Sequence, residues 1–331
     1  MKILFVKLSS IGDVIHTLPV LSSLKAAYPE AEIDWVVEEP SAELLRGHPL
    51  LNRVLIFRRR EILSDFRQKR GSAWRELKSF LRSLRRKRYD LVIDFQGLLK
   101  SGLLVGIARG RCKIGFANHR EGSPLFYNLK LSPYDPDQHA VRRYLSVLKV
   151  LGLKPETVSF SLPPLPSFEE LKQRFALPAG FAVFIPKARW PSKLWTVSGW
   201  RSLAQAFERR GILPIFVGSQ ADSPYVEKIL TESPGLSLCG RLGLLELATL
   251  LKEASSVVSV DTGPMHLAAA LGRPVVALFG PTAPWRTGPY GDDHRVLFKG
   301  LSCSPCFRKD CPDRVCLERI SPEEVLRACN L

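Results

Sequence analysis

Apolar residues in this chain fall mostly into short, nearly unbroken runs, which alternate with longer segments where they recur every three or four residues. Short apolar runs are typical of strands buried on both faces of a parallel sheet, and the longer spacing is typical of helices. In the first half the pattern predicts strands at residues 3–6, 33–37, 54–57, 91–95 and 113–116, and helices at 14–27, 72–88, 102–108 and 138–151.

The same alternation starts again in the second half of the chain. It predicts strands at residues 182–185, 214–217, 257–260, 275–279 and 296–298, and helices at 197–210, 225–231, 244–253 and 264–271. Near the end, "SPEEVLRA" predicts a last helix, with Ser321 as its cap and Glu324 completing a capping box.

A proline-rich segment separates the two halves. Residues 159–170, "SFSLPPLPSFEE", carry three prolines in four positions and form the best linker candidate. We therefore predict an α/β protein with domains at 1–158 and 171–320, followed by a terminal helix at 321–331. Ligands of open parallel sheets bind outside the carboxyl ends of the strands, so loops 8–13 and 261–266 are expected to face a cleft between the domains.

The charge of the chain is strongly positive and unevenly spread. The formal net charge is +16, and residues 46–88 hold fifteen Lys or Arg against three acids. Such an excess attracts polyanions: nucleic acid, an anionic membrane surface or a phosphorylated substrate. Nucleic acid is disfavoured because the aromatic residues of this stretch are too widely spaced for a stacking platform. With no apolar run near the ~18 residues of a membrane span and no leader pattern, we expect a cytoplasmic protein.

Two loops carry candidate phosphate-binding chemistry. In "SVDTGPMHLAAAL" a buried strand ends before Asp261, so Thr262 and Gly263 lie at a helix N-terminus, which is a favourable anion site, and His266 follows one turn later. Taken singly, Asp261 could be only a helix cap and His266 only a core histidine. In "PKARWPSKLW", residues 186–195, the cations Lys187, Arg189 and Lys193 could neutralise a leaving diphosphate.

A third loop presents a carboxylate where parallel-sheet proteins often hold a phosphate. The first strand is followed by "KLSSIGDVIHTLP", residues 7–19, with Asp13 directly before an apolar helix. Asp13 could simply cap a helix that begins at Val14. A general base in the cleft is the other interpretation, and the two are compatible.

Seven segments in order resemble glycosyltransferase family nine, the lipopolysaccharide heptosyltransferases, and are most similar to its type I members. They are "VKLSSIGDVIHTLP" (6–19), "IDWVVEE" (33–39), "DFQGLLKSG" (94–102), "REGSPLFYN" (120–128), "HAVRR" (139–143), "SKLW" (192–195) and "SVDTGPMHLAAAL" (259–271). The resemblance implies the GT-B architecture: two facing Rossmann-like domains, the acceptor on the first, the nucleotide sugar on the second, and the last helix packing back on the first domain.

The resemblance also implies a reaction, with no required metal or other cofactor. L-glycero-D-manno-heptose would pass from ADP-heptose to a Kdo hydroxyl of Kdo₂-lipid A with inversion, Asp13 acting as general base. Matching donor positions are Lys193, Asp261, Thr262, Gly263, His266, Arg189, Asp222 and Leu242. Matching acceptor positions are Ser10, Gly12, Arg58, Arg59, Arg60, Arg120, His139 and Arg143. We expect a monomer, peripheral on the anionic cytoplasmic face of the inner membrane and without a nucleic-acid partner.

Four closely spaced cysteines depart from the type I pattern. Cys303, Cys306, Cys311 and Cys316 could bind zinc or an iron–sulfur cluster, pair as disulfides, or have only a structural role, which we favour. Similar clusters elsewhere in the family leave type II, or another acceptor, as an alternative to type I. A GT-B nucleotide-sugar epimerase also remains open, although the basic stretch argues for an acceptor that an epimerase does not need.

Overall fold

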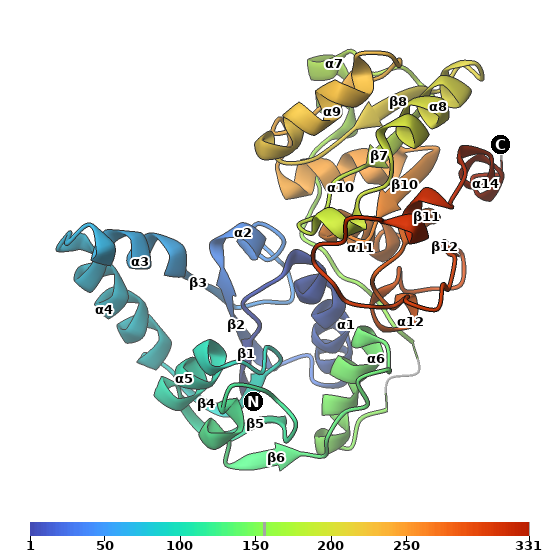
Figure 1. Ribbon diagram of the computed structural model, residues 1–331. Helices are drawn as coiled ribbons and strands as arrows, with labels where there is room; N and C mark the ends of the chain where they lie inside the picture. Colours follow the sequence, from blue (N-terminus) through green and yellow to red (C-terminus); the bar gives the residue numbers. More distant parts are fainter. Residues whose placement is uncertain (155–156, 331) are drawn as a thin grey trace. The chain divides into compact units, whose positions relative to one another are not determined.

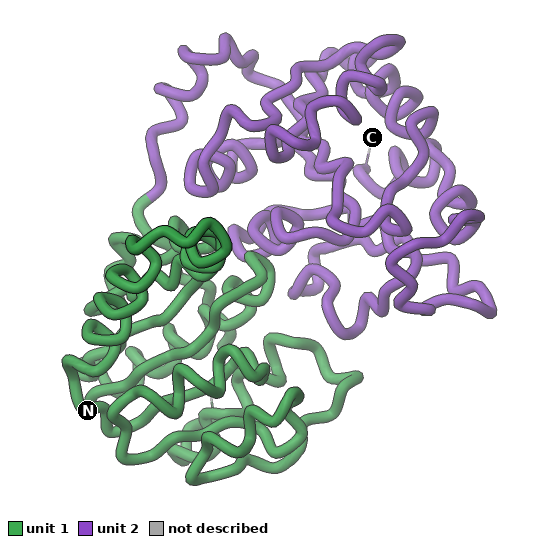
Figure 2. Tube along the Cα trace, turned by 60° about the vertical axis from the view of Figure 1, so that its left-hand side comes forward, with its two compact units in different colours: residues 1–164 green, residues 165–331 purple. Residues whose placement is uncertain are grey.

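The computed structural model describes residues 1–154 and 157–330 and divides the chain into two compact units, Met1–Pro164 and Leu165–Leu331 (Figure 2). The boundary falls within the predicted linker. The linker is shorter than the predicted residues 159–170, because helix α7 (Phe168–Phe175) begins within that range. Among the described helices, none is long and apolar enough to cross a membrane.

Unit 1 is built on one parallel sheet with helices on both faces (Figure 1). Its strand order is β3-β2-β1-β4-β5-β6. Strands are therefore added toward one edge up to β3 and toward the other edge from β4, so the strand order reverses between β1 and β4. The strands are β1 (Lys2–Val6), β2 (Glu32–Glu38), β3 (Arg53–Phe57), β4 (Arg88–Asp94), β5 (Arg109–Phe116) and β6 (Leu129–Leu131). The helices are α1 (Ile11–Ala27), α2 (Glu39–Ala42), α3 (Arg59–Arg67), α4 (Ser72–Arg85), α5 (Leu99–Ile107) and α6 (Ala140–Leu145), with 3₁₀ segments η1 (Ser123–Phe126) and η2 (Ser146–Leu151).

Alternation along the strands of unit 1 sends successive side chains to opposite faces of the sheet. On one face, Leu4, Val6 and Val92 pack with Phe80 and Leu84 of α4 and with α5. On the other face, aromatic rings connect β1 to α6: Phe95 lies between Phe5, at 4.9 Å, and Tyr144 of α6, at 5.9 Å between ring centroids. Both faces are therefore covered, as the unbroken apolar runs predict.

Unit 2 repeats the design with the order β12-β11-β10-β7-β8-β9, and here the reversal lies between β7 and β10. Its strands are β7 (Phe181–Ile185), β8 (Leu213–Phe216), β9 (Leu236–Ser237), β10 (Ser256–Val260), β11 (Val275–Phe279) and β12 (Arg295–Phe298). Its helices, besides α7, are α8 (Val197–Glu208), α9 (Ser223–Leu230), α10 (Leu244–Glu253), α11 (Gly263–Ala270), α12 (Pro284–Thr287), α13 (Val315–Glu318) and α14 (Pro322–Ala328), with 3₁₀ segments η3 (Pro191–Lys193) and η4 (Gln220–Asp222).

The last helix, α14, begins with the predicted capping box and packs on α8. Val325 joins the core of unit 2, and the indole N–H of Trp195 donates to the carbonyl of Ile320 just before the helix. Contact of this helix with the first domain stays a prediction, and residue 331 lies outside the described residues.

The strand predictions are confirmed to within a few residues, whereas short or weakly apolar elements were missed. β6 and β9 have only three and two residues, too few to show an alternating pattern. α3 is rich in arginine and buries only Ile62, so its helical spacing is faint. The predicted helix 138–151 is in fact α6 followed by the 3₁₀ segment η2.

Candidate functional site

Polar loops gather at the point of each sheet where the strand order reverses. In unit 1, the segments after β1, β4 and β5 leave neighbouring parallel strands at the same edge of the sheet. In unit 2, the segments after β7, β10 and β11 do the same. Ligands of open α/β sheets bind at such points, because the loops on the two sides of the reversal diverge and leave a crevice. Each unit therefore has its own candidate site.

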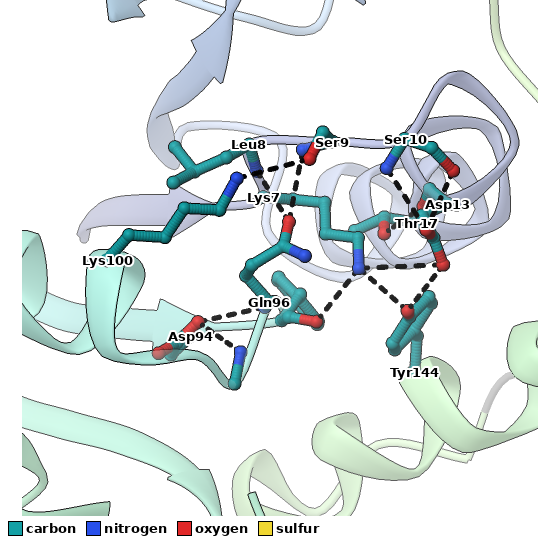
Figure 3. A network of polar contacts seen from close by, with 12 residues as sticks. Lys7, Leu8, Ser9, Ser10, Asp13, Thr17, Asp94, Gln96, Lys100 and Tyr144 are labelled. Carbon is teal, nitrogen blue, oxygen red and sulfur yellow. Dashed lines mark hydrogen bonds and ion pairs between the residues drawn. The ribbon is translucent and has the colours of Figure 1, made fainter. Parts of the chain in front are cut away.

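Lys7 is the centre of the unit 1 site, directly after β1. Its side chain is 2% exposed, and its ammonium donates to the hydroxyl of Tyr144 at 2.8 Å and to the carbonyl of Phe95 at 3.2 Å. The same nitrogen lies 3.7 Å from Oδ1 of Asp13 (Figure 3). Burial lowers the pKa of Lys7, opposed by the charges of Asp13 and Asp94. The only sequence signal for this lysine was its place after the first strand.

Asp13 is held by α1 itself and by Lys7 and Tyr144 (Figure 3). Helix α1 begins at Ile11 with Ser10 as its N-cap, so the prediction that Asp13 caps a helix starting at Val14 is wrong. Asp13 is the third helical residue, and its Oδ2 accepts from the amide and hydroxyl of Ser10 at 3.0 and 2.9 Å. Its Oδ1 accepts from the Tyr144 hydroxyl at 3.2 Å.

The environment of Asp13 favours its ionised form. Burial of one side raises the pKa, but the Lys7 charge and the Ser10 and Tyr144 hydrogen bonds outweigh this effect, so the net pKa lies below its ordinary value. The side chain keeps 38% of its surface exposed. Asp13 is thus a fixed, ionised carboxylate that solvent and ligand can reach, which a general base requires.

A hollow of about 160 Å³ opens beside this carboxylate. Its lining brings together Asp13, Arg120 and Arg143, three of the predicted residues, with Lys7 and His119. Arg143 is held over the ring of Tyr134 at 4.4 Å, and its buried Nε lacks a hydrogen-bond partner among the described residues. Three cations around one carboxylate give the hollow a net positive lining, suited to an anionic ligand.

His119, which the sequence motifs did not single out, is kept neutral in this hollow. Burial lowers its pKa to about 3, and the charges of Lys7, Arg143 and Arg120 act in the same direction. Its Nδ1 lies 2.9 Å from the hydroxyl of Tyr127, which donates to buried Asp94 at 2.7 Å. The Tyr127 oxygen therefore accepts from Nδ1–H, which leaves Nε2 as an acceptor. Its place just after β5 was the one available signal.

The other predicted acceptor residues lie outside the lining of this hollow. Gly12 is buried in the first turn of α1 next to Ser10, and His139 caps α6, its Nδ1 accepting from the amide of Val141. Arg58 and Arg59 are paired with Glu39 and Glu38, both at 3.2 Å. With Arg60 they line a separate hollow of about 140 Å³. Their roles in acceptor binding stay predictions.

In unit 2 the structure joins two predicted donor residues in a partly buried ion pair. Nζ of Lys193, from η3 after β7, lies 2.6 Å from Oδ2 of Asp261, which follows β10. The hydroxyl of Thr282, after β11, donates to the same oxygen at 2.6 Å. Three neighbouring strands thus contribute to one cluster. Thr282 was not among the predicted site residues, because its loop has no motif of its own.

The start of α11 lies directly beside this cluster in the chain. Thr262 is its N-cap in extended conformation and Gly263 its first residue, while His266 is buried one turn later. Arg189 is exposed and Leu242 is partly buried. Asp222 accepts from the amide and hydroxyl of Ser219 at 2.8 and 2.7 Å and so stabilises η4. The donor contacts of these residues stay predictions.

The cysteine cluster is not assembled as a metal site. All seven cysteines are free thiols. Within residues 1–154 and 157–330, no group of three or more His, Cys, Asp or Glu is placed to hold a metal ion. Cys306 instead donates its amide to the carbonyl of Pro281, and Cys316 packs close to Gly280. These contacts, with the two residues that follow β11, are of the kind a structural role needs, and that role stays a prediction.

Comparison with known proteins identifies the family. Residues 77–316 match the profile of glycosyltransferase family 9 (heptosyltransferase). The chain belongs to this family. It is 34% identical to lipopolysaccharide heptosyltransferase 1 of Pseudomonas aeruginosa, over 98% of this chain and 96% of the relative, and 33% identical to that of Escherichia coli K12, over 89% and 93%.

Solved structures agree with this assignment. Escherichia coli heptosyltransferase WaaC with ADP matches with a TM-score of 0.81 at 33% identity, over 99% of this chain and 98% of WaaC. Escherichia coli heptosyltransferase II matches in fold, with a TM-score of 0.80 at 24% identity. The α/β, GT-B prediction is confirmed, and this family 9 chain is a glycosyltransferase. The match decides for a transferase over an epimerase.

Proposed function

We propose that this family 9 enzyme transfers L-glycero-D-manno-heptose from ADP-heptose to a Kdo hydroxyl of Kdo₂-lipid A, with inversion and with Asp13 as the general base. The observation that carries the proposal is the Asp13 carboxylate, fixed and ionised in a cation-lined hollow at the reversal point of unit 1. Kdo is an acidic sugar, and the Lys7, Arg120 and Arg143 charges suit its carboxylate while Asp13 faces its hydroxyl.

The proposed chemistry needs only one carboxylate. Asp13 accepts the proton of the acceptor hydroxyl, whose oxygen forms the new bond to the anomeric carbon as the bond to ADP breaks on the opposite side. The diphosphate leaves without a general acid because it is a good leaving group. The ammonium of Lys193 and the amides at the start of α11 stabilise the charge that develops on it.

The relatives support the choice of substrates. WaaC was solved with ADP and with ADP-2-deoxy-2-fluoro heptose, at 33% and 32% identity to this chain. The relatives in P. aeruginosa and E. coli carry the name lipopolysaccharide heptosyltransferase 1. We therefore propose ADP-heptose as donor, and a place at the cytoplasmic face of the inner membrane, where a lipid acceptor would be presented.

Replacement of Asp13 tests the mechanism. Asp13→Asn keeps the shape and an oxygen that accepts from Ser10, but it cannot take a proton, so we expect kcat to fall roughly 10²–10⁴-fold with little change in Tm. Ser10→Ala separates proton transfer from positioning: it removes the hydroxyl that donates to Asp13, costs about 1 kcal/mol of stability and leaves a carboxylate that can take a proton, so kcat should fall far less than in Asp13→Asn. An Asp13→Asn enzyme with wild-type turnover would exclude Asp13 as the base.

The acceptor is tested by substrate comparison. Kdo₂-lipid A and the same lipid already carrying one heptose are offered with ADP-heptose, and release of ADP is measured. We expect kcat/KM to be higher for Kdo₂-lipid A. Preference for the heptosylated lipid would assign the enzyme to the type II reaction and leave the role of Asp13 intact.

A further inference from the structure

Helix α4 carries an unusual outer face. A hollow of about 760 Å³ is lined by six of its residues and by Arg109 of β5. The α4 residues are Trp74, Leu77, Lys78, Leu81, Arg82 and Arg85, and with Arg109 we call them the α4 stripe. Each of the six α4 residues has another of the set three or four positions away, so they follow one another along one side of the helix.

The fully buried residues that hold α4 in place are not those of the stripe. Ala73, Phe80 and Leu84 are buried and hold α4 against the sheet, with Phe80 stacked on Phe57 of β3 at 4.7 Å. Trp74, by contrast, is 68% exposed, and its ring has only an edge contact with Phe66 of α3. Leu77 and Leu81 are half-buried, and Leu81 also packs on the core of unit 1. Folding therefore leaves Trp74 exposed beside two partly covered leucines in one hollow, and a grouped apolar surface marks an interaction site more often than a single exposed side chain does.

The cations of the stripe are uncompensated. Among the described residues, Lys78, Arg82, Arg85 and Arg109 take part in no ion pair. Arg58 and Arg59, at the start of α3, differ because they are already paired with glutamates. The α4 stripe thus holds four cations with no ion-pair partner among the described residues, in contrast to Arg58 and Arg59.

The apolar residues and the unpaired cations of the α4 stripe together indicate one kind of partner. A purely anionic partner would use the cations and leave Trp74 and the leucines in water, whereas a purely apolar partner would bury the cations. A phospholipid surface offers acyl chains beside phosphates, which is the setting that amphipathic helices with Trp, Leu, Lys and Arg occupy. Tryptophan in particular favours the boundary between headgroups and acyl chains.

We propose that the α4 stripe docks unit 1 on an anionic phospholipid bilayer. Trp74 enters the acyl boundary, the uncovered parts of Leu77 and Leu81 extend its apolar surface, and the four cations meet lipid phosphates. The inference rests on the proposed function in one respect: a membrane-embedded acceptor gives the docking its purpose. Each cation at an anionic surface strengthens binding on the order of fivefold, so three reversals are expected to weaken it roughly 100-fold or more.

The test uses the full-length protein and sedimentation with vesicles. Wild type is expected to bind vesicles of phosphatidylcholine and phosphatidylglycerol and not pure phosphatidylcholine. Lys78→Glu with Arg82→Glu and Arg85→Glu should abolish binding, and Trp74→Ala should weaken it at constant charge. The matched control reverses three exposed cations of unit 2, Arg209, Lys228 and Lys252, to Glu, which changes the net charge equally and should leave most of the binding.

A second measurement reports insertion directly. Tryptophan fluorescence is recorded with vesicles whose phosphatidylglycerol is brominated on the acyl chains. Quenching should be present in wild type, lost in Trp74→Phe and retained in Trp285→Phe, whose indole is 47% exposed in unit 2. Quenching that survives Trp74→Phe overturns the proposal, as does equal vesicle binding by the stripe triple variant and its control.

Turnover separates this proposal from the proposed function. With a Kdo acceptor that lacks acyl chains, the stripe variants should keep wild-type kcat/KM. Loss of turnover on that soluble acceptor would place the stripe in acceptor binding and overturn the docking role. Loss of a dimer in Trp74→Ala would assign the stripe to a second copy and likewise overturn it. Vesicle binding without heptose transfer by the wild type would refute the proposed function alone.

Discussion

At the scale of single residues, the two sites differ in how they use a lysine beside a carboxylate. In unit 1 the Lys7 ammonium stands 3.7 Å from Asp13, and its hydrogen bonds go to Tyr144 and Phe95. In unit 2 the Lys193 ammonium is bound directly to Asp261 at 2.6 Å. The first arrangement keeps a carboxylate ionised but available. The second fixes a cation whose remaining protons can meet a ligand.

Lys7 should set the acid limb of the pH–rate profile. The wild-type rate is expected to fall as pH drops through the pKa of Asp13, which the Lys7 charge holds down against burial. Lys7→Met keeps the length of the side chain and removes its charge, so the pKa of Asp13 rises and the acid limb moves to higher pH. The measurement is kcat/KM against pH.

Lys100→Met is the control for that profile. Lys100 contacts the same loop through Ser9 and is paired with Glu38 at 2.7 Å, yet it does not touch Asp13. The acid limb of the Lys100→Met enzyme should coincide with that of wild type. If Lys7→Met also left the limb unmoved while remaining folded, Lys7 would have no part in the ionisation of Asp13.

Lys193 should be needed for catalysis more than for folding. Lys193→Ala removes the cation proposed to meet the leaving diphosphate, so kcat should fall roughly 10²-fold or more. Lys187→Ala is the matched control in the same loop. Its ammonium lies over Tyr225, 4.9 Å from the ring centroid, so we expect its loss to lower kcat much less. Steady-state ADP release compares them. Equal, small effects of both changes would remove Lys193 from the proposed mechanism.

At the scale of elements, the sequence predicted what depends on neighbouring positions. Strands β1 and β7 are buried along nearly their whole length, so their apolar runs were unambiguous. The start of α1 was misplaced because Asp13 and Ser10 are both good caps. The spacing Ser-x-x-Asp is that of a capping box, with Asp in place of the usual Glu, and it was the signal for the earlier start.

Local apolar and capping patterns could not predict long-range contacts. Tyr144 meets Lys7 across 137 positions, because α6 packs on α1 beside β1, and no local spacing encodes that. Asp261 and Lys193 were each predicted from their own loops, and their pairing follows from the adjacency of β7 and β10. The neutral state of His119 depends on burial and on three cations from separate segments.

The turn between β4 and α5 should be intolerant of change at Gly97. This residue has φ +65°, and a Cβ there would lie 2.4 Å from the ring of His119. Gly97→Ala therefore adds left-handed strain of about 1–2 kcal/mol and also displaces a ring of the proposed acceptor hollow. We expect a lower Tm and a higher acceptor KM, with ADP affinity unchanged.

Gly47→Ala separates the two effects at Gly97. Gly47 has φ +69° with nothing near its would-be Cβ, so it carries the strain alone. It should lower Tm without changing the acceptor KM. A Gly97→Ala enzyme that matches Gly47→Ala in both quantities would show that His119 is not positioned by this turn.

At the scale of the whole molecule, each unit has its own sheet, core and site. The residues that line the hollow beside Asp13 belong to unit 1, and Lys193, Asp261 and Thr282 belong to unit 2. Each site sits at the strand reversal of its own sheet. A division of labour follows, with acceptor chemistry on one unit and donor chemistry on the other, and it can be tested without a complete reaction.

ADP alone should stabilise unit 2 and leave unit 1 unchanged. A ligand at a hundredfold excess over its Kd stabilises the unit that binds it by about 2.7 kcal/mol. In hydrogen exchange of the full-length enzyme, amides of β7, β10 and β11 that exchange only by unfolding of unit 2 should slow by up to about 100-fold, while those of β1 and β4 keep their rates. Lys193→Ala should diminish the effect and Asp13→Asn should retain it. Equal slowing in both sheets would contradict separate donor binding, because the two cores would then respond to ADP as one body.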